Sequence, residues 1–320
     1  MTGAAALGAL GIMAATGCSS NAASSASSSA SGSTAAGGVE KEIIVASFGT
    51  TFDNSRHITI GAVEDIIREN FPDWKVQRAF TAQDIIDKLA AGKGIAEDGS
   101  YDNNPVTIMN FEDAVADAQD KGVKQLVVLA THVTGGAEYQ DVKNSLGEVT
   151  SKFDKAVLCP PLLDKDEDYE KVADIMHGVT EEYDDGKTAI CLMGHGNGNL
   201  GDESDKYYQQ LQETFTKKGY KNYYIFTVES EAVSYDNVIK LMKESGVDYK
   251  KVVLRDIMVV AGDHANNDMA DMNDPESFAS QFKAAGYDVT CVLDGMGQIS
   301  GIQFMYLDHV KATMEENSLK

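Results

Sequence analysis

Three apolar segments in the second half of the chain each lead into a side chain that can bind a metal ion. Residues 189–193 lead into His195, residues 223–228 into Glu229, and residues 257–260 into His264. If these segments are parallel strands of one sheet, their carboxyl ends meet at the edge where open α/β sheets bind ligands. Two imidazoles and a carboxylate at that edge would suit a borderline divalent metal ion.

Each of these residues also has a simpler interpretation. His195 lies between two glycines, which let the backbone approach a ligand closely, but a loop histidine without a role fits the same pattern. Glu229 alone is equally a helix-capping or salt-bridged acid. His264 lies at a potential helix start with Asp263 as N-cap, where Asp263 or Asp268 could accept a hydrogen bond from the imidazole.

The other histidines carry weaker signals. His132 and Glu138 occupy the equivalent stretch of the first half, where they would either line a substrate pocket or serve the structure. His57, His177 and His309 lie in helix-like contexts without obvious partners, and we assign them no functional role.

Hydrophobic periodicity predicts alternating strands and helices. Strands are expected over residues 41–48, 74–80, 125–130, 155–159, 189–193, 223–228, 251–260 and 287–293. Helices are expected over residues 58–71, 82–89, 111–119, 138–153, 205–218, 235–245, 275–285 and 302–316, with a loop over 91–105. This alternation indicates βαβ units and parallel sheets, and therefore an α/β fold.

The two halves look like copies. Residues 43–50 correspond to residues 188–195, and residues 125–132 correspond to residues 251–258. We expect two similar Rossmann-like domains, each a parallel sheet flanked by helices, over residues 40–182 and 183–300. Residues 301–320 would form a helix that packs back on the body. A duplicated α/β unit places a ligand cleft between its halves.

Composition excludes several classes of protein. The net charge of −23 over 320 residues argues against a nucleic-acid partner, because phosphate binding requires a basic face. The acidity serves solubility or attracts divalent cations. The absence of GxSxG, Walker A and CxxC motifs argues against common hydrolases, nucleotide triphosphatases and zinc ribbons. Cys159, Cys191 and Cys291 lie in or beside apolar runs and are expected in the core.

The N-terminal segment has a different character. Residues 1–39 carry no charged side chain, and the apolar stretch 4–15 is too short to span a bilayer. Small residues precede Cys18, and a Ser/Ala/Gly tract follows it, as in a bacterial lipoprotein signal with a flexible tether. The basic residues that open such signals are missing. We expect a lipid anchor on Cys18 and an extracytoplasmic location. The alternative is a low-complexity tail with an incidental cysteine on a cytoplasmic protein.

From Lys41 to Lys311 the chain resembles the anaerobic sirohydrochlorin cobaltochelatases of the class II chelatase superfamily. The resemblance is strongest in the block from Met258 to Ala270, MVVAGDHANNDMA. Shorter motifs occur in the shared order, namely SFGTT at 47–51, RAFT at 78–81, GGAEY at 135–139, MGHG at 193–196 and VES at 228–230.

The resemblance implies a fold of two similar α/β domains and an enzyme, a lyase that inserts Co²⁺ into sirohydrochlorin during cobalamin synthesis. By resemblance the metal ligands are His195, Glu229 and His264, and Glu138 is an acid in the cleft. His195, His264 or Glu138 would take the pyrrole protons. Ala137 stands where the family has an acidic residue, and residues 197–201 lack the histidines often found there.

Several alternatives remain open. Arg78, by its position only, together with His132 and Tyr139, is a candidate for binding the polyanionic tetrapyrrole. Ligand type does not choose between Co²⁺, Fe²⁺ and Ni²⁺. The rival function is a non-enzymatic extracytoplasmic protein that binds haem, another tetrapyrrole or cobalt. A homo-oligomer is compatible with either function.

Overall fold

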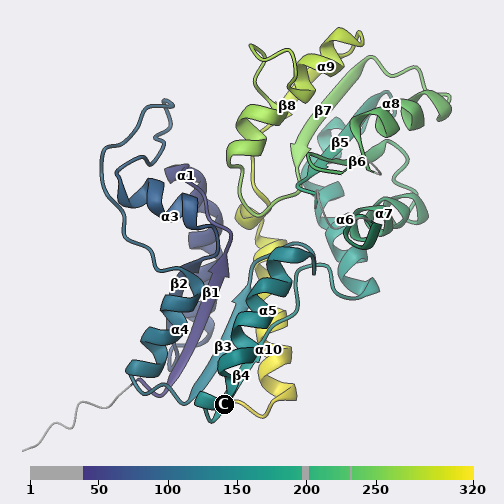
Figure 1. Ribbon diagram of the computed structural model, residues 1–320. Coiled ribbons are helices and arrows are strands. Elements are labelled where there is room, and N and C mark those ends of the chain that lie inside the picture. Colours follow the sequence, from purple (N-terminus) through teal and green to yellow (C-terminus); the bar gives the residue numbers. More distant parts are fainter. Residues whose placement is uncertain (1–38, 197–201, 231–232) are drawn as a thin grey trace, which may run out of the picture. The chain divides into compact units, whose positions relative to one another are not determined.

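The computed structural model describes residues 39–196, 202–230 and 233–320 of the chain. Residues 39–320 contain two four-stranded parallel sheets flanked by helices (Figure 1). The predicted α/β class is therefore confirmed.

The expected anchor at Cys18 and the loop at 197–201 lie outside the described residues. Within those residues, no helix is both long and apolar enough to cross a membrane.

The first sheet has the strand order β2-β1-β3-β4. Its strands are β1 (Lys41–Ser47), β2 (Lys75–Phe80), β3 (Gln125–Ala130) and β4 (Lys155–Leu158). The central strands β1 and β3 are buried almost throughout, which explains their unbroken apolar sequences, since helices cover both faces of the sheet.

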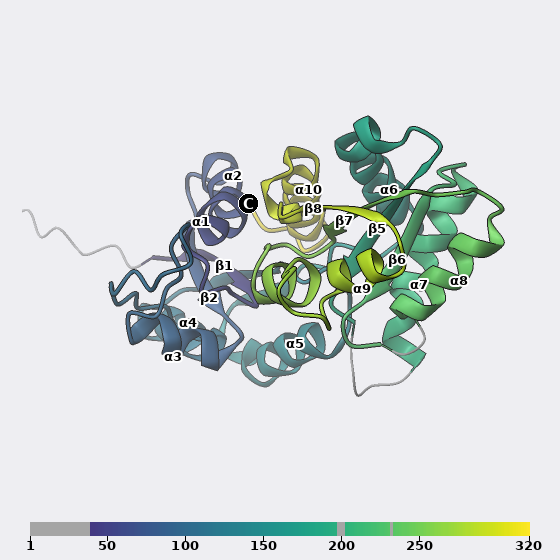
Figure 2. The ribbon, with the colours of Figure 1, turned by 90° about the horizontal axis from the view of Figure 1, so that it is seen from above.

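Helices cover both faces of the first sheet. They are α1 (Asp53–Arg56), the π-helical turn η1 (His57–Gly61), α2 (Ala62–Asn70), α3 (Gln83–Ala90), α4 (Phe111–Asp120) and α5 (Ala137–Val149). Apolar residues of α4 and α5 pack with Ile44 and Val128 on one face. Apolar residues of α2 and of the C-terminal helix α10 (Ser300–Glu316) pack with Ile43 and Val127 on the other. Helices α2 and α10 run beside each other (Figure 2).

The second sheet repeats this topology, with the order β6-β5-β7-β8. Its strands are β5 (Thr188–Gly194), β6 (Tyr223–Thr227), β7 (Lys251–Asp256) and β8 (Asp288–Val292). Its helical segments are α6 (Asp166–Thr180), α7 (Asp202–Lys217), α8 (Tyr235–Glu244), the π-helical η4 (His264–Met269) and α9 (Phe278–Ala284). Short 3₁₀ turns are η2 (Thr150–Lys152), η3 (Glu181–Tyr183) and η5 (Met296–Gln298).

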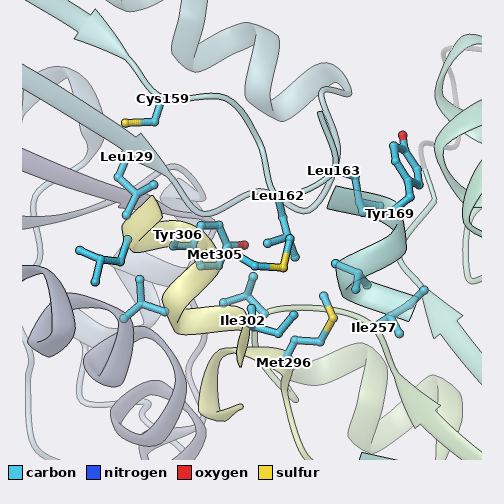
Figure 3. Packing of buried hydrophobic residues seen from close by; sticks show 14 of the residues in the cluster. Leu129, Cys159, Leu162, Leu163, Tyr169, Ile257, Met296, Ile302, Met305 and Tyr306 are labelled. Atoms are coloured by element: carbon cyan, nitrogen blue, oxygen red, sulfur yellow. The ribbon is translucent and has the colours of Figure 1, made fainter. Parts of the chain in front are cut away.

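Two helices each follow the last strand of one sheet but pack on the other sheet. Helix α6 precedes the second sheet in the chain and covers one of its faces, where Thr180 and His177 contact the buried Tyr223 hydroxyl at 2.8 and 2.9 Å. Helix α10 follows the second sheet but packs on the first, where the Tyr306 hydroxyl donates to the Thr131 carbonyl at 2.9 Å. One apolar cluster therefore includes residues of both sheets (Figure 3). The domain boundaries expected from the sequence remain predictions.

Three elements differ from the sequence-based expectations. Helix α6 was not predicted, although Tyr169, Val172, Ala173 and Met176 follow helical spacing. The helix expected from residue 58 begins at Asp53 and includes a π-helical turn. The strand expected over 251–260 ends at Asp256, because beyond it the carbonyls of Met258 and Val259 accept from the backbone of the segment before α10, at 2.8 and 2.9 Å.

Candidate metal centre

His195, Glu229 and His264 come together in the structure. One ligand atom from each lies within 4.8 Å of the others, and His195 Nε2 stands 3.9 Å from Glu229 Oε1. The two imidazole rings meet edge to face, with their centroids 4.8 Å apart. His195 and Glu229 follow the neighbouring parallel strands β5 and β6, and His264 follows β7 after a longer loop.

Local backbone geometry holds His195 at the end of β5. The next residue, Gly196, has φ +86°, and a Cβ there would lie 2.9 Å from Thr227 Oγ1. The backbone N–H of Glu229 donates to the His195 carbonyl at 3.0 Å, which joins the two loops. His195 Nδ1 lies 2.9 Å from the Gly196 carbonyl, which can only accept. Nδ1 therefore carries the proton, and Nε2 is left free to bind a metal.

His264 is oriented in the same way by a carboxylate. Its Nδ1 lies 2.6 Å from Asp268 Oδ2, one turn further along η4. The ionised carboxylate accepts the Nδ1 proton, so Nε2 again offers its lone pair. Of the two acids that the sequence offered for this role, the structure selects Asp268, while Asp263 accepts from Asn267 at 2.7 Å. Such an acceptor fixes the tautomer and raises the basicity of a metal-binding histidine.

These three groups fit a divalent transition metal ion. Such an ion binds imidazole nitrogen at about 2.0–2.1 Å and carboxylate oxygen at about 2.0–2.2 Å, so its ligand atoms stand roughly 3 to 3.5 Å apart. The observed separations are slightly longer and close with small side-chain rotations, because the side chains of His195 and Glu229 are 29% and 43% exposed. Three protein ligands leave coordination positions open for a substrate.

A cavity of about 310 Å³ opens beside the two histidines. It is lined from both halves of the chain. The apolar residues of its lining are Phe48, Ile60, Ile85, Met258, Val259 and Val260. The hydroxyl-bearing residues of its lining are Ser47, Thr50, Thr51, Thr131, Thr134 and Tyr208. The expected ligand cleft thus combines an apolar surface with a few polar groups, as small-molecule sites do.

His132 and Glu138 both line this cavity. The His132 ring is buried, and neither of its nitrogens has a hydrogen-bond partner among the described residues. Burial lowers its pKa to about 4, so the imidazole is neutral near pH 7. Glu138 Oε2 lies 3.9 Å from His132 Nε2. Burial raises the pKa of Glu138 and the Glu229 charge adds to this, while His195 and His264 oppose it.

Two tyrosines border the cavity in supporting roles. Tyr139 donates its hydroxyl proton to the Cys159 carbonyl at 3.0 Å, and burial raises its pKa to about 12. Burial also raises the pKa of Tyr208 to about 12, against hydrogen bonds from the backbone of Gly196 and His195. Tyr139 is among the residues that line the cavity, and its hydroxyl is engaged with the backbone.

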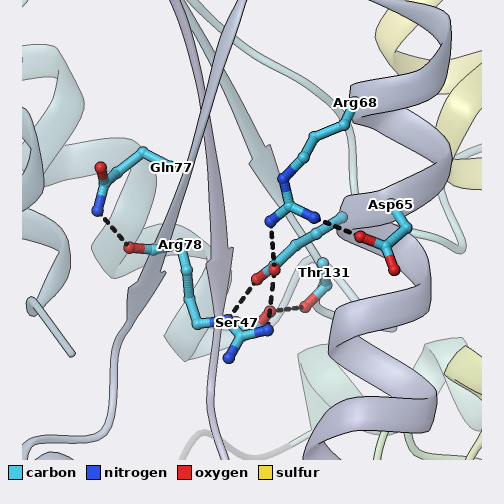
Figure 4. A network of polar contacts seen from close by, with 7 residues as sticks. Ser47, Asp65, Arg68, Gln77, Arg78 and Thr131 are labelled. Carbon is cyan, nitrogen blue, oxygen red and sulfur yellow. Dashed lines mark hydrogen bonds and ion pairs between the residues drawn. The ribbon is translucent and has the colours of Figure 1, made fainter. Parts of the chain in front are cut away.

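Arg78 does not reach the cavity. Its guanidinium donates to the buried Glu64 carboxylate, with Nε at 2.6 Å and Nη2 at 2.8 Å, and Arg68 also contacts Glu64 (Figure 4). A buried carboxylate is costly without such a partner. The guanidinium expected to meet the substrate is therefore held by an internal ion pair, which β2 and α2 bring together.

Two of the remaining histidines have partners that the sequence did not reveal. His177 stacks on Tyr220 with ring centroids 4.0 Å apart, and His309 Nε2 lies 3.4 Å from Asp168 Oδ1. His57 is exposed. Cys159 and Cys191 are buried as expected, whereas Cys291 is half-buried.

Sequence reasoning missed several residues of the cavity, among them Phe48 and Lys88. Phe48 is 41% exposed, and its ring lies 6.4 Å from that of His195. Lys88 lines the cavity from α3. The amphipathic spacing of α3 was visible, but which of its polar residues faces a ligand depends on how the helix sits on the sheet.

Comparisons with known proteins show the family to which the chain is similar. The family model "Cobalt chelatase (CbiK)" matches residues 41–315. A sirohydrochlorin cobaltochelatase of Salmonella typhimurium is 28% identical over 274 residues, which cover 85% of this chain and 96% of that protein. Among solved structures, SirB from Bacillus subtilis with Fe³⁺ has a TM-score of 0.56 at 12% identity, covering 88% of this chain and 99% of that one. DR2241 from Deinococcus radiodurans has a TM-score of 0.46 at 10% identity, covering 85% and 54%.

The hydrogen bond between His264 and Asp268 predicts a loss of metal affinity in Asp268→Asn. The carboxamide is a weaker acceptor, so Co²⁺ affinity should fall by about 10–100-fold, as for other removed carboxylate partners of metal-binding histidines. Titration calorimetry with Co²⁺ measures the effect. Asp271→Asn removes a charge from the same segment and should bind Co²⁺ as the unaltered protein does. Equal affinities in all three proteins would contradict the role of Asp268.

The buried neutral His132 predicts a pH-dependent stability. The unfolded imidazole titrates near 6.5 and the folded one near 4. Between these values the unfolded state binds more protons, so stability falls as pH drops through this window. From pH 7 to pH 5 this group alone should remove about 2 kcal/mol from the free energy of unfolding.

Denaturant unfolding at both pH values tests this expectation. His132→Asn should lose correspondingly less stability between pH 7 and pH 5, whereas His57→Asn, at an exposed site, should keep the full loss. An unchanged pH dependence in His132→Asn would show that the imidazole titrates normally in the folded protein.

Proposed function

The chain belongs to the cobalt chelatase (CbiK) family and is a metal chelatase, and on that premise we propose that it inserts Co²⁺ into sirohydrochlorin. The observation that carries the proposal is the convergence of His195, Glu229 and His264 beside a cavity lined from both halves of the chain. The sirohydrochlorin cobaltochelatase from Salmonella, which aligns over nearly its whole length, supports this choice of substrate.

In this proposal Co²⁺ is a substrate that the two Nε2 atoms and the Glu229 carboxylate hold at the edge of the cavity. The remaining positions of the ion are open to water and then to the pyrrole nitrogens. Metal binding requires neutral imidazoles, so activity should fall in acid. Imidazole ligands suit Fe²⁺ and Ni²⁺ as well, and the preference for Co²⁺ rests on the family.

Insertion of Co²⁺ replaces two pyrrole N–H protons, which need an acceptor. Glu138 lines the cavity, and its raised pKa makes it a stronger base than an exposed carboxylate. His132 stands 3.9 Å from Glu138, and because burial lowers the pKa of His132 to about 4, it stays neutral and leaves the proton on Glu138.

Removing either imidazole should abolish metallation, because the ion would lose a ligand. In His195→Ala and His264→Ala we expect Co²⁺-dependent turnover of sirohydrochlorin, followed by absorbance, to fall at least about 100-fold. Near-normal turnover in both histidine variants would refute the ligand assignment.

Glu138→Gln should bind Co²⁺ normally yet lower kcat, since it removes only the proton acceptor.

Ala137→Asp should leave Co²⁺ affinity nearly unchanged, because residue 137 is not a metal ligand.

The segment around Cys18 favours a second candidate function, a non-enzymatic extracytoplasmic protein that binds haem, another tetrapyrrole or cobalt. It favours this function because sirohydrochlorin is made in the cytoplasm. The absorbance assay separates the two functions. Many equivalents of cobalt–sirohydrochlorin per protein indicate an enzyme, and a single bound equivalent indicates a carrier.

A lipid on Cys18 is the testable part of the extracytoplasmic proposal. Expression of the full chain in a bacterium with radiolabelled palmitate should label the protein and recover it with membranes. Cys18→Ala should abolish the label, while Cys159→Ala, at a buried site, should keep it. Equal labelling of the unaltered protein and the Cys18 variant would refute lipidation at this cysteine.

A further inference from the structure

The proposed substrate raises an electrostatic problem at the cavity. Sirohydrochlorin carries peripheral carboxylates, while the chain has a net charge of −23. Asp84, Glu138 and Asp263 also line the cavity. Without a positive group, a polyanion entering this site would meet like charges. Among the described residues that line the cavity, Lys88 is the only Lys or Arg.

The nearby arginines are already engaged. Arg78 is held by Glu64. Arg56 is 3% exposed, pairs with Asp53, and donates to the Thr50 carbonyl at 3.3 Å. Moving either guanidinium toward a ligand would leave a buried or partly buried partner unpaired, at a high cost.

The packing of α3 fixes the direction in which Lys88 points. Ile86 and Leu89 are buried in a core cluster with Phe80, so the helix cannot rotate freely. Asp84, Ile85 and Lys88 lie on the cavity side of the same helix. Positions 84, 85 and 88 share one helical face, because residues three and four apart are neighbours.

Lys88 is available to a ligand. Its ammonium lies 3.3 Å from Asp84 Oδ2, and the two side chains are 56% and 69% exposed. An exposed pair of this kind contributes little to stability, so exchanging Asp84 for a substrate carboxylate costs little. The long flexible stem of lysine lets the ammonium follow a carboxylate at the rim of the cavity.

We infer that Lys88 binds a peripheral carboxylate of the tetrapyrrole and thereby orients the macrocycle over the metal centre. This inference rests on the proposed function and adds the residue that recognises the substrate's charge. The metal ligands come from the second sheet, and Lys88 comes from a helix of the first. The macrocycle would lie between them against the exposed ring of Phe48.

The test compares Lys88→Ala, Lys88→Glu and Lys93→Glu. Lys93 is exposed just beyond α3 and does not line the cavity, so its variant makes the same charge change without the contact. We expect Lys88→Glu to raise KM for sirohydrochlorin about tenfold or more, equivalent to at least 1.4 kcal/mol, with Lys88→Ala in between. Lys93→Glu should stay within about twofold of the unaltered protein. Co²⁺ affinity without tetrapyrrole should be the same in all of them.

A second arm uses the methyl ester of sirohydrochlorin, whose carboxylates are neutralised. The difference between the unaltered protein and Lys88→Glu should disappear with the ester. A KM in Lys88→Glu within twofold of the original value, or an equal rise in Lys93→Glu, would overturn the inference. So would a difference that persists with the ester.

The outcome can be separated from that of the proposed function. If the unaltered protein binds sirohydrochlorin without turnover, the chelatase proposal fails, and the same variants are compared by Kd from an absorbance titration. A weaker Kd only in the Lys88 variants supports the inference in that case. An unaltered Kd, or no binding of the tetrapyrrole to the unaltered protein, overturns it.

Discussion

Two imidazoles and a carboxylate, each of which would otherwise bind water or a proton, must be held close together. This requirement determines the structure of the second half of the molecule. His195, Glu229 and His264 stay within 4.8 Å of one another only because parallel strands bring their carboxyl ends to one edge. The Nδ1 atoms of His195 and His264 donate to a carbonyl and to a carboxylate, respectively, so the Nε2 lone pairs of both rings are available. The fold thus supplies the position of each ligand, and the hydrogen bonds supply its chemical state.

Strand positions and the three metal-capable residues could be predicted from sequence, because apolar runs and the residues that follow them are local features. Arg78 could not be placed, because its partner Glu64 belongs to another element and is recognised only once α2 packs on β2. The segment 257–260 has a strand-like sequence, yet its carbonyls bond to the chain before α10. Lys88 was missed because local periodicity does not tell which helical face borders a cavity.

The two halves share a topology but divide the chemistry between them. In the correspondence of residues 125–132 with 251–258, His132 is the counterpart of Met258, and both residues line the same cavity. The first half contributes the buried neutral imidazole, Glu138 and Lys88, while the second contributes the three groups that could hold a metal ion. Two halves of the same topology therefore present different sets of side chains.

The exchange of α6 and α10 between the sheets has a consequence for biosynthesis. All strands of the first sheet have been made once Leu158 is complete, but the helix that finishes covering one of its faces ends at Glu316. At about 5–20 residues per second, that apolar face waits on the order of ten seconds for its cover. Until α10 is made, Val127 and Leu129 lack part of their apolar cover, and exposed apolar surface of this kind favours aggregation.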